Sequence, residues 1–441
     1  MADPKYDRAL QIVQRLREHG FAAVFNGGCV RDRLLGVPPK DYDIATDARP
    51  EAVQQLFEHT IPVGAKFGVV IVVLDGDHFE VATFRADAPY IDGRRPSAVH
   101  FGTIEEDAKR RDFTIGGMYL DPIDNRLIDL VGGTRDLRAG VVRAIGNPRE
   151  RFAEDRLRML RAIRFASRLN FEIEPETFAA IREASSTIND ISAERIGEEL
   201  TMIFTGGNCG VAMDLLLESG LMQAVLPEVV AMIGCEQPAN FHPEGDVYRH
   251  TRLAMSMLEA GCSETLAWGV LFHDIAKPPC IGFNDDKITF YGHTERGGEM
   301  AEEILNRLKR SRFVQERVSY LVRDHLRMTM AFRMRTATLR RMIMEEGFDE
   351  LLELGRLDAL SSNSYLGYYH FCRRAKEQFS APELKPQRLV SGSDLIAMGF
   401  TPGPRFREIL KEVEDLQLDG AIADREAALD YIRGHFASVS S

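Results

Sequence analysis

The chain has 441 residues, of which 44% are hydrophobic and 28% are charged. These values are typical of a globular protein in water, and the length predicts roughly two to four domains. The net charge of −12 argues against a protein coated with nucleic acid, although local basic patches can still bind it. We find neither the apolar core of a signal peptide nor a run of about 18 apolar residues, so we expect no secretion and no membrane span. The six cysteines form no CxxC pair, which predicts free thiols in a reducing cytoplasm.

The first 148 residues predict an α+β unit with a small sheet. Apolar residues at helical spacing predict a helix over 6–19, and two short helices are expected at 30–35 and 50–58. The apolar runs VVIVVL and FEVATF are separated by DGD, which predicts a β-hairpin. Further strands are expected before the Gly27-Gly28 turn, at DYDIAT, and on both sides of a second Gly-Gly turn within 127–146.

From Glu150 to about Glu377 nearly the whole sequence has helical periodicity. Segments that contain proline and glycine interrupt it at 234–246 and 380–387, and the last unit has helical segments around the turn GFTPGPR. The predicted domains are therefore 1–148, 149–233, 234–379 and 380–441.

Two carboxylates at alternate positions, Asp41 and Asp43, are the first candidate site. Residues i and i+2 of a strand share a face, so these side chains point the same way and suit a divalent cation such as Mg²⁺. The preceding Gly27 and Gly28 allow backbone N–H groups to approach a phosphate, and Arg31 can add a charge-assisted contact. Glu80, in the strand FEVATF, is a candidate third catalytic carboxylate from a neighbouring strand.

Four ordered motifs resemble those of bacterial class II tRNA nucleotidyltransferases and poly(A) polymerases. They are GGCVRD, DYD, RRDFT at 110–114 and RFAEDRLRMLRAIRFA at 151–166, and the resemblance extends over about residues 20–225. It implies a polymerase-β-like head with a small mixed sheet, followed by an all-α body. It also implies template-independent, metal-dependent transfer of a nucleotide from CTP or ATP to an RNA 3′ end, with release of pyrophosphate.

The resemblance also assigns residue roles. It implies that the aspartate pair at 41 and 43 binds Mg²⁺. It also implies that Glu154, Asp155 and Arg158 form a nucleotide-binding EDxxR motif, whose Asp and Arg read the base. A carboxylate and a guanidinium complement the Watson–Crick edges of cytosine and adenine, and the i, i+3 spacing predicts that Asp155 and Arg158 share one helix face. Gly116 departs from the motif, because the family usually has Asn there. The remaining nucleotide-binding residues implied are Gly27, Gly28, Arg31 and Asp32 at the triphosphate, Arg111 and Asp112 at the ribose, and Arg161 and Arg164.

The head motifs alone leave three products open: CCA, the terminal A only, or poly(A). Val37 stands where poly(A) polymerases usually have a basic residue, and the segment 86–102 resembles the flexible loop of enzymes that add the full CCA. We therefore expect CCA addition, with tRNA, CTP and ATP as partners and with neither DNA nor a membrane.

A histidine set in the helical half resembles the HD phosphohydrolase superfamily. Nitrogen and carboxylate ligands from several helices suit a transition metal such as Ni, Mn, Fe or Co better than Mg²⁺. The resemblance implies metal-assisted hydrolysis of a phosphomonoester or a 2′,3′-cyclic phosphate at an RNA 3′ end, or else an inactive RNA-binding scaffold. The candidate ligands are His250, His273, Asp274, His293, His325 and Asp358.

Two further alternatives are an HD phosphohydrolase whose head only grips RNA, and a non-enzymatic tRNA-binding protein. The acidic and histidine sets argue against the second. The segment SGSDLIAMGFTPGPRF resembles the C-terminal unit of many family members, and its turn before a helix could meet a tRNA phosphate.

Overall fold

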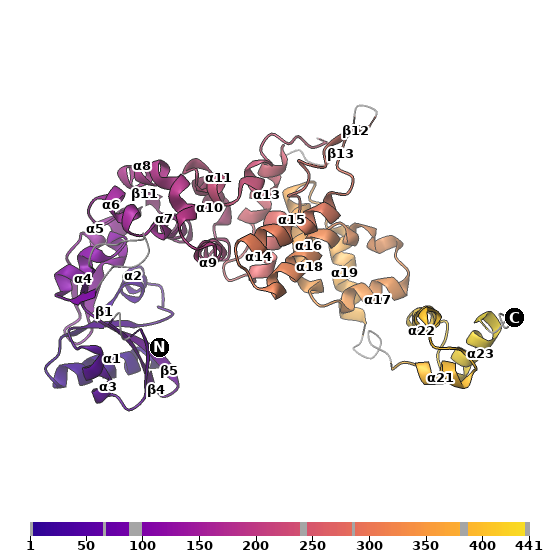
Figure 1. The fold of residues 1–441 in the computed structure, drawn as a ribbon, viewed down its shortest axis with the longest axis horizontal. Helices are drawn as coiled ribbons and strands as arrows, with labels where there is room; N and C mark the ends of the chain where they lie inside the picture. The colour runs from indigo at the N-terminus through magenta and orange to yellow at the C-terminus, as the bar shows by residue number, and fades with distance from the viewer. Residues whose placement is uncertain are drawn as a thin grey trace. The chain divides into compact units, whose positions relative to one another are not determined.

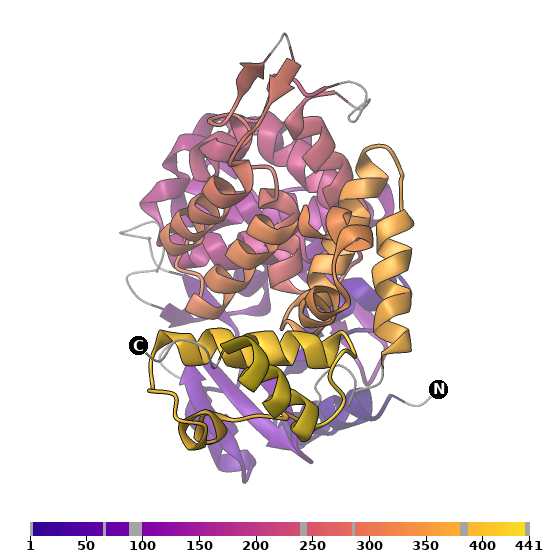
Figure 2. The ribbon, with the colours of Figure 1, turned by 90° about the vertical axis from the view of Figure 1, so that its right-hand side faces the viewer.

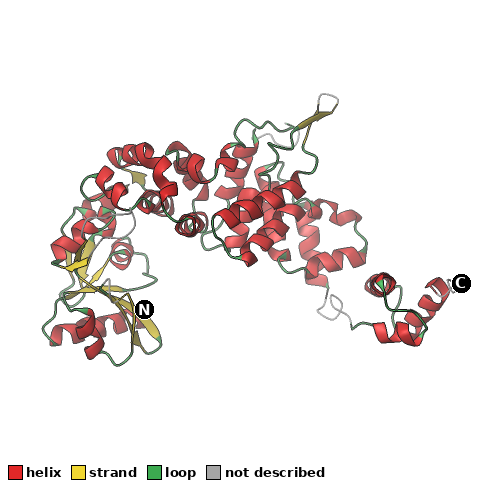
Figure 3. Ribbon diagram, in the orientation of Figure 1, coloured by secondary structure: helices red, strands yellow, loops and turns green. Residues whose placement is uncertain are grey.

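The computed structural model describes residues 3–64, 68–87, 99–238, 245–284, 287–379 and 387–436. It divides into two compact units, coloured along the chain in Figure 1. The first contains Met1–Val230 with Leu258–Gly261 and Arg307–Arg310, and the second contains Ala231–Met257, Cys262–Asn306 and Ser311–Ser441. The long sheet belongs to the first unit, and the second is built almost entirely of helices (Figure 3).

The first unit is organised around a seven-stranded mixed sheet. Its order is β3-β4-β5-β2-β1-β8-β9, and only the β2/β5 pair is parallel. The predicted DGD hairpin is confirmed, because Asp75 and Gly76 both adopt positive φ between β4 and β5. The strands are β1 (Ala23–Asn26), β2 (Asp43–Thr46), β3 (Thr60–Gly64), β4 (Val69–Leu74), β5 (Asp77–Thr83), β8 (Met118–Asp121) and β9 (Arg126–Asp129).

Short helices join and cover these strands. They are α1 (Pro4–Glu18), α2 (Gly28–Leu34), α3 (Pro50–Leu56), α4 (Ile104–Arg110) and α5 (Gly133–Ala139), with a 3₁₀ turn at Thr114–Gly116. The expected Gly-Gly turn between two strands is wrong, because Gly133 begins helix α5. The Asp129 carboxylate accepts hydrogen bonds from the Gly133 and Thr134 N–H groups, which satisfies the start of that helix. The expected loop at 86–102 falls mainly on 88–98, outside the described residues, and its flanks form the pair β6 (Arg85–Asp87) and β7 (Val99–Phe101).

A helical region completes the first unit. Its helices are α6 (Pro148–Glu154), α7 (Leu157–Leu169), α8 (Pro175–Ala184), α9 (Ala193–Phe204), α10 (Cys209–Glu218), α11 (Leu221–Val225) and α12 (Pro227–Val230). The parallel pair β10 (Val141–Val142) and β11 (Glu172–Ile173) connects the segment before α6 with the segment after α7. Helix α7 is buried along much of its length, with Leu160, Ile163 and Ala166 fully inaccessible.

The second unit packs helices around an apolar helix. That helix, α14 (Glu264–Phe272), is buried at every position from Thr265 onward, and Trp268 is its largest fully buried side chain. Helices α13 (Val247–Ser256), α16 (Arg312–Asp324) and α18 (Phe348–Ser361) pack against it. The same unit contains α15 (His293–Arg307), α17 (Thr336–Met344) and α19 (Gly367–Gln378). The C-terminal helices are α21 (Gly392–Ala397), α22 (Pro404–Leu418) and α23 (Arg425–Phe436), and the expected turn before α22 is confirmed.

The helical structure expected over nearly all of residues 150–377 is interrupted by a hairpin that the sequence pattern did not predict. Strands β12 (Gly282–Asn284) and β13 (Lys287–Thr289) pair antiparallel and extend away from the helices of their unit (Figure 1, Figure 2). Among the described residues no helix is both long and apolar enough to cross a membrane. The six cysteines are unpaired, as expected.

Candidate active site

Asp43 and Glu80 lie together at the edge of one cavity. Asp43 begins β2, and Glu80 projects from the exposed face of β5, the strand parallel to it. Both residues, with Asn26 and Arg111, line a cavity of about 230 Å³. Burial, with the nearby Glu80 carboxylate, raises the pKa of Asp43 to about 6. Two carboxylates held this closely provide hard oxygen ligands for Mg²⁺, so the residues present fit the cation that the sequence implied.

Asp41 is more exposed than its partner and carries an ion pair. Its Oδ1 lies 2.6 Å from the ammonium of Lys5, and the side chains of Lys5 and Asp41 are 29% and 63% exposed. A cation bound through Asp41 would compete with this ammonium. No sequence motif indicates a role for Lys5, which lies one residue before the helix predicted over 6–19.

The Arg111 guanidinium lies close to the glycine turn at Gly27. Gly27 has φ 68°, and a Cβ there would lie 3.4 Å from Arg111 Nη1. The guanidinium donates to Asn26 Oδ1 at 2.9 Å and to Asp107 Oδ2 at 3.0 Å. Although burial opposes it, the nearby arginines hold the pKa of Asp107 below its ordinary value. Several donors of the Arg111 guanidinium are therefore already bound to Asn26 and Asp107. A direct contact between Arg111 and the ribose of a nucleotide stays a prediction.

Three guanidinium groups surround the ring of Phe165. Arg31, Arg161 and Arg164 lie 5.4, 5.5 and 4.6 Å from its centroid. Each also binds a carboxylate: Arg31 binds its neighbour Asp32, Arg161 binds Asp112, and Arg164 binds Glu199. The structure therefore brings two predicted motifs, GGCVRD and RRDFT, against one face of α7.

Asp112 is held by Arg161 at 2.6 Å. Burial opposes ionisation, but this guanidinium and a backbone N–H keep the pKa of Asp112 below its ordinary value. A Cβ added at Gly116 would lie 3.5 Å from Asp112 Oδ1, so the side chain missing at residue 116 would have contacted this carboxylate.

The base-reading motif is arranged differently from the prediction. Helix α6 ends at Glu154, Asp155 has φ −143° and ψ 106°, and α7 begins only at Leu157. Asp155 and Arg158 therefore do not share one helix face, because the helix is interrupted between them. Arg158 instead donates to Glu154 at 2.7 Å.

Arg195 of α9 is the guanidinium that holds Asp155. Its Nη2 lies 2.9 Å from Asp155 Oδ2, while Oδ1 accepts the Leu157 N–H at 3.1 Å. Arg195 Nη1 is buried and has no hydrogen-bond partner among the described residues. No local sequence pattern predicts this contact, since the two residues are separated by 40 positions.

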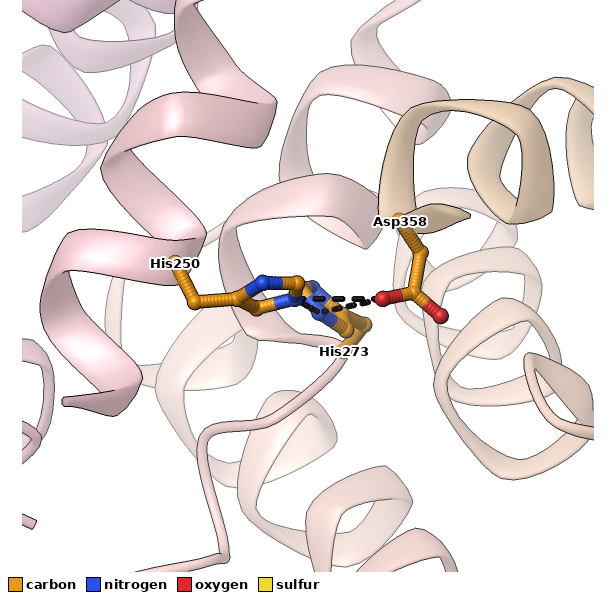
Figure 4. A group of neighbouring side chains, drawn as sticks. All are labelled: His250, His273 and Asp358. Atoms are coloured by element: carbon orange, nitrogen blue, oxygen red, sulfur yellow. Dashed lines mark hydrogen bonds and ion pairs between the residues drawn. The ribbon is translucent and has the colours of Figure 1, made fainter. Parts of the chain in front are cut away.

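A second constellation lies in the other unit, where all six predicted residues of the histidine set come together. His250 of α13, His273 at the end of α14 and Asp358 of α18 converge (Figure 4). His250 Nε2 lies 3.1 Å from both His273 Nε2 and Asp358 Oδ1. The ligand atoms of this group all lie within 4.8 Å of one another, and the same is true of Asp274, His293 and His325.

Asp274 lies between the two groups. Its Oδ2 is 3.3 Å from His273 Nε2, and its Oδ1 is 3.6 Å from His293 Nε2 and 3.8 Å from His325 Nε2. Asp274 Oδ1 and His293 Nε2 are buried without a hydrogen-bond partner among the described residues. Unpaired buried ligand atoms are expected where a metal completes the site, so these residues fit two cations that share Asp274.

The imidazoles are oriented by backbone carbonyls. The Nδ1 atoms of His273, His293 and His325 lie 2.8, 2.7 and 2.7 Å from the carbonyl three residues earlier in each case. A donating Nδ1–H leaves the Nε2 lone pair free to bind a metal. Burial lowers the pKa of His325 to about 4 and also lowers that of His293, which keeps both rings neutral near pH 7.

Three family models match the chain in order. They are the Poly A polymerase head domain over residues 23–143, the Probable RNA and SrmB- binding site of polymerase A over 170–233, and the HD domain over 247–354. These matches confirm the predicted head, RNA-binding body and HD domain as structural classes. The head domain and the HD domain each imply the use of divalent metals.

Comparison with individual proteins gives the same assignment. A CCA-adding enzyme of Ligilactobacillus salivarius is 44% identical over 218 residues, but the matched stretch spans 49% of this chain and only 54% of that relative. The solved structure of the Bacillus stearothermophilus CCA-adding enzyme in complex with CTP matches with TM-score 0.73 and 26% identity, covering 98% of this chain and 99% of that one. A CCA-adding enzyme of Enterococcus faecalis is 32% identical over 434 residues, which cover 96% of this chain and 95% of the relative. Since this last similarity spans nearly all of both proteins, the chain belongs to the family of CCA-adding enzymes, which are nucleotidyltransferases.

Proposed function

We propose that this protein adds CCA to tRNA 3′ ends from CTP and ATP in the cytoplasm. The observation that carries the proposal is the cavity where Asp43 and Glu80 meet beside the glycine turn, in a chain of the CCA-adding family. The related Bacillus stearothermophilus enzyme, solved with CTP, supports a cytidine nucleotide as one substrate.

The reaction is an in-line displacement at the α-phosphate. The tRNA 3′-oxygen forms a bond to phosphorus, the bond to the β-phosphate oxygen breaks, and pyrophosphate leaves. Asp41, Asp43 and Glu80 would hold Mg²⁺, which would supply Lewis-acid activation of the hydroxyl and charge neutralisation at the triphosphate. Gly27 and Gly28 leave room for the phosphates, because neither carries a Cβ.

Base selection rests on Asp155 and Arg158. Asp155 presents carboxylate oxygens held in place by Arg195, and Arg158 presents a guanidinium held by Glu154. An exocyclic amine on cytosine or adenine can donate to the carboxylate, whereas the carbonyl of uracil or guanine at that position would leave it unpaired. Arg161, on the same helix as Arg158, holds Asp112 through an ion pair.

An extension assay tests the proposal. Three tRNA transcripts, ending at the discriminator base, at C and at CC, are incubated with CTP, ATP or both in the presence of Mg²⁺. We expect the first to gain CCA and then stop. Addition of a single A to the CC-ended transcript alone would indicate an A-adding enzyme, and a long A ladder would indicate a poly(A) polymerase. Failure to extend any of the three would refute the proposal.

A second activity is favoured by the buried histidine set. We propose that the HD domain hydrolyses a phosphomonoester or a 2′,3′-cyclic phosphate at an RNA 3′ end. The supporting observation is the pair of three-ligand groups that share the buried Asp274, with imidazole nitrogens suited to Ni, Mn, Fe or Co.

This activity is testable independently of the first. The cyclic phosphate of a nucleoside should be opened by protein loaded with one of these metals, and His273→Ala should abolish that hydrolysis while CCA addition continues. Hydrolysis that survives His273→Ala with no bound metal would contradict the assignment. Metal content measured by mass spectrometry accompanies each assay.

A further inference from the structure

Two buried polar side chains lie beside the histidine set and belong to neither of its two metal-ligand groups. Lys277, one turn after Asp274, and Gln237 are each 7% exposed. Lys277 Nζ donates to Gln237 Oε1 at 2.6 Å and lies 2.7 Å from Asp274 Oδ2. The same ammonium lies 5.4 Å from the centre of the Phe290 ring, the residue whose carbonyl holds His293. Lys277 therefore contacts the proposed metal ligand Asp274 directly, and Gln237 is connected to it through Lys277.

The amide nitrogen of Gln237 lacks an acceptor in the part of the chain that the structure describes. This Nε2 atom is buried. The amide cannot be turned over to remove the problem, because the lysine ammonium only donates and must face the amide oxygen. A buried amide N–H without an acceptor is costly, and such groups are found where a ligand supplies the acceptor.

The arrangement places two donors beside a set of metal ligands that otherwise offers lone pairs. The carboxylates of Asp274 and Asp358 and the Nε2 atoms of the histidines are acceptors, which suit cations. The Lys277 ammonium and the Gln237 amide are of the opposite kind and suit an anion. A phosphate ester suits both kinds of group, since its non-bridging oxygens can bind metals and can also accept hydrogen bonds from the two donors.

We propose that Lys277 and Gln237 form the subsite that binds the non-bridging oxygens of the phosphate group at the HD centre. This inference rests on the proposed hydrolytic function. In that reaction the oxygen of water bonds to phosphorus, the bond from phosphorus to a ribose oxygen breaks, and the proton from water ends on that ribose oxygen. Negative charge on the non-bridging oxygens rises as the water attacks, and the two donors stabilise it.

The test measures binding of inorganic phosphate to the metal-loaded, full-length protein by calorimetry. Gln237→Glu keeps the acceptor for Lys277 but replaces the free amide with a repelling carboxylate, and Lys277→Met removes the ammonium with little change in volume. We expect each variant to bind phosphate at least about tenfold more weakly, since one hydrogen bond to a charged group is lost. Lys287→Met, at an exposed lysine of β13, is the matched control and should bind phosphate as the parent does.

Two further readouts separate this subsite from the metals and from the hydrolysis. Metal content should stay equal in the parent and in Gln237→Glu, and KM for a nucleoside 2′,3′-cyclic phosphate should rise more than kcat falls. Unchanged phosphate affinity in Gln237→Glu, or no phosphate binding by the parent, overturns the subsite even if hydrolysis is present. Weakened phosphate binding in a protein that hydrolyses no ester supports the subsite and refutes the hydrolase. If Lys277→Met fails to fold, Gln237→Glu alone decides.

Discussion

Arg195 should control how well the enzyme rejects UTP and GTP, although it lies outside every predicted motif. Its guanidinium is the contact that fixes Asp155 Oδ2, at 2.9 Å. Arg195→Met keeps the length of the side-chain stem and removes that contact. Of its contacts with described residues, the Asp155 carboxylate then keeps the Leu157 N–H and can rotate, so it no longer presents a fixed acceptor to the incoming base.

The magnitude follows from the environment of this ion pair. A hydrogen bond to a charged group contributes about 1.5–3 kcal/mol. The side chains of Arg195 and Asp155 are 22% and 18% exposed, so solvent weakens the interaction only in part. At about 1.4 kcal/mol for each tenfold change, the lower half of that range corresponds to a loss of selectivity of about tenfold to fortyfold.

The assay compares kcat/KM for CTP and UTP on a tRNA transcript that ends at the discriminator base. The ratio should fall by about tenfold or more in Arg195→Met. Arg182→Met, at an exposed arginine of α8, is the control and should keep the parental ratio. If Arg195→Met changes the ratio by less than about twofold while the protein stays folded, the support of Asp155 by Arg195 is irrelevant to selection and the reasoning fails.

Three further predictions concern the same unit. Asp43→Asn should abolish incorporation of both nucleotides without lowering stability at pH 7, because the amide removes repulsion from Glu80; extension assays and urea unfolding test this, and retained incorporation would contradict it. Since the folded-state pKa of Asp112 lies below its ordinary value of 3.8, its stabilisation is complete above that pH and is lost as the pH falls; the slope of unfolding free energy between about pH 5 and 3 should flatten in Asp112→Asn, and an unchanged slope would refute this. A Cβ at Gly133 would lie 2.2 Å from the Thr114 carbonyl oxygen, so Gly133→Ala should cost about 1–3 kcal/mol and lower the melting temperature, which calorimetry would detect.

The sheet of the first unit was largely predictable because its signals are local. The β-branched run of β4, the DGD turn and the alternation Phe79-Glu80-Val81 each depend on neighbours in sequence. Helix α5 was missed because its stability comes from Asp129, a carboxylate at the end of the preceding strand. The break at Asp155 was missed because the motif has good helical periodicity, whereas the extended residue is held by the Leu157 N–H on one carboxylate oxygen and by the distant Arg195 on the other.

In the candidate sites, too, the features with local sequence signals were predictable and the contacts between distant segments were not. Ordered motifs identified the residues of both acidic and histidine sets, and the structure brings Asp43 to Glu80 and all six HD residues to one place. Motifs do not report what supports those residues. Lys5 beside Asp41, Phe165 among three arginines and Gln237 beside Lys277 are contacts between distant segments, which no local pattern specifies.

The pairing of β10 with β11 limits where this enzyme can be cut or recombined. Glu172 N–H donates to the Gly140 carbonyl at 2.9 Å, and Glu174 N–H donates to the Val142 carbonyl at 3.0 Å, so the strand after α7 returns to the strand before α6. In a chimera joined at residue 148, β10 and Asp112 would come from one parent, and their partners β11 and Arg161 would come from the other. Neither contact would then form between residues of the same parent. A junction placed after α9, which ends at Phe204, keeps this strand pair and the Asp155–Arg195 contact on one piece, and it is the one we expect to transfer nucleotide choice between homologous enzymes.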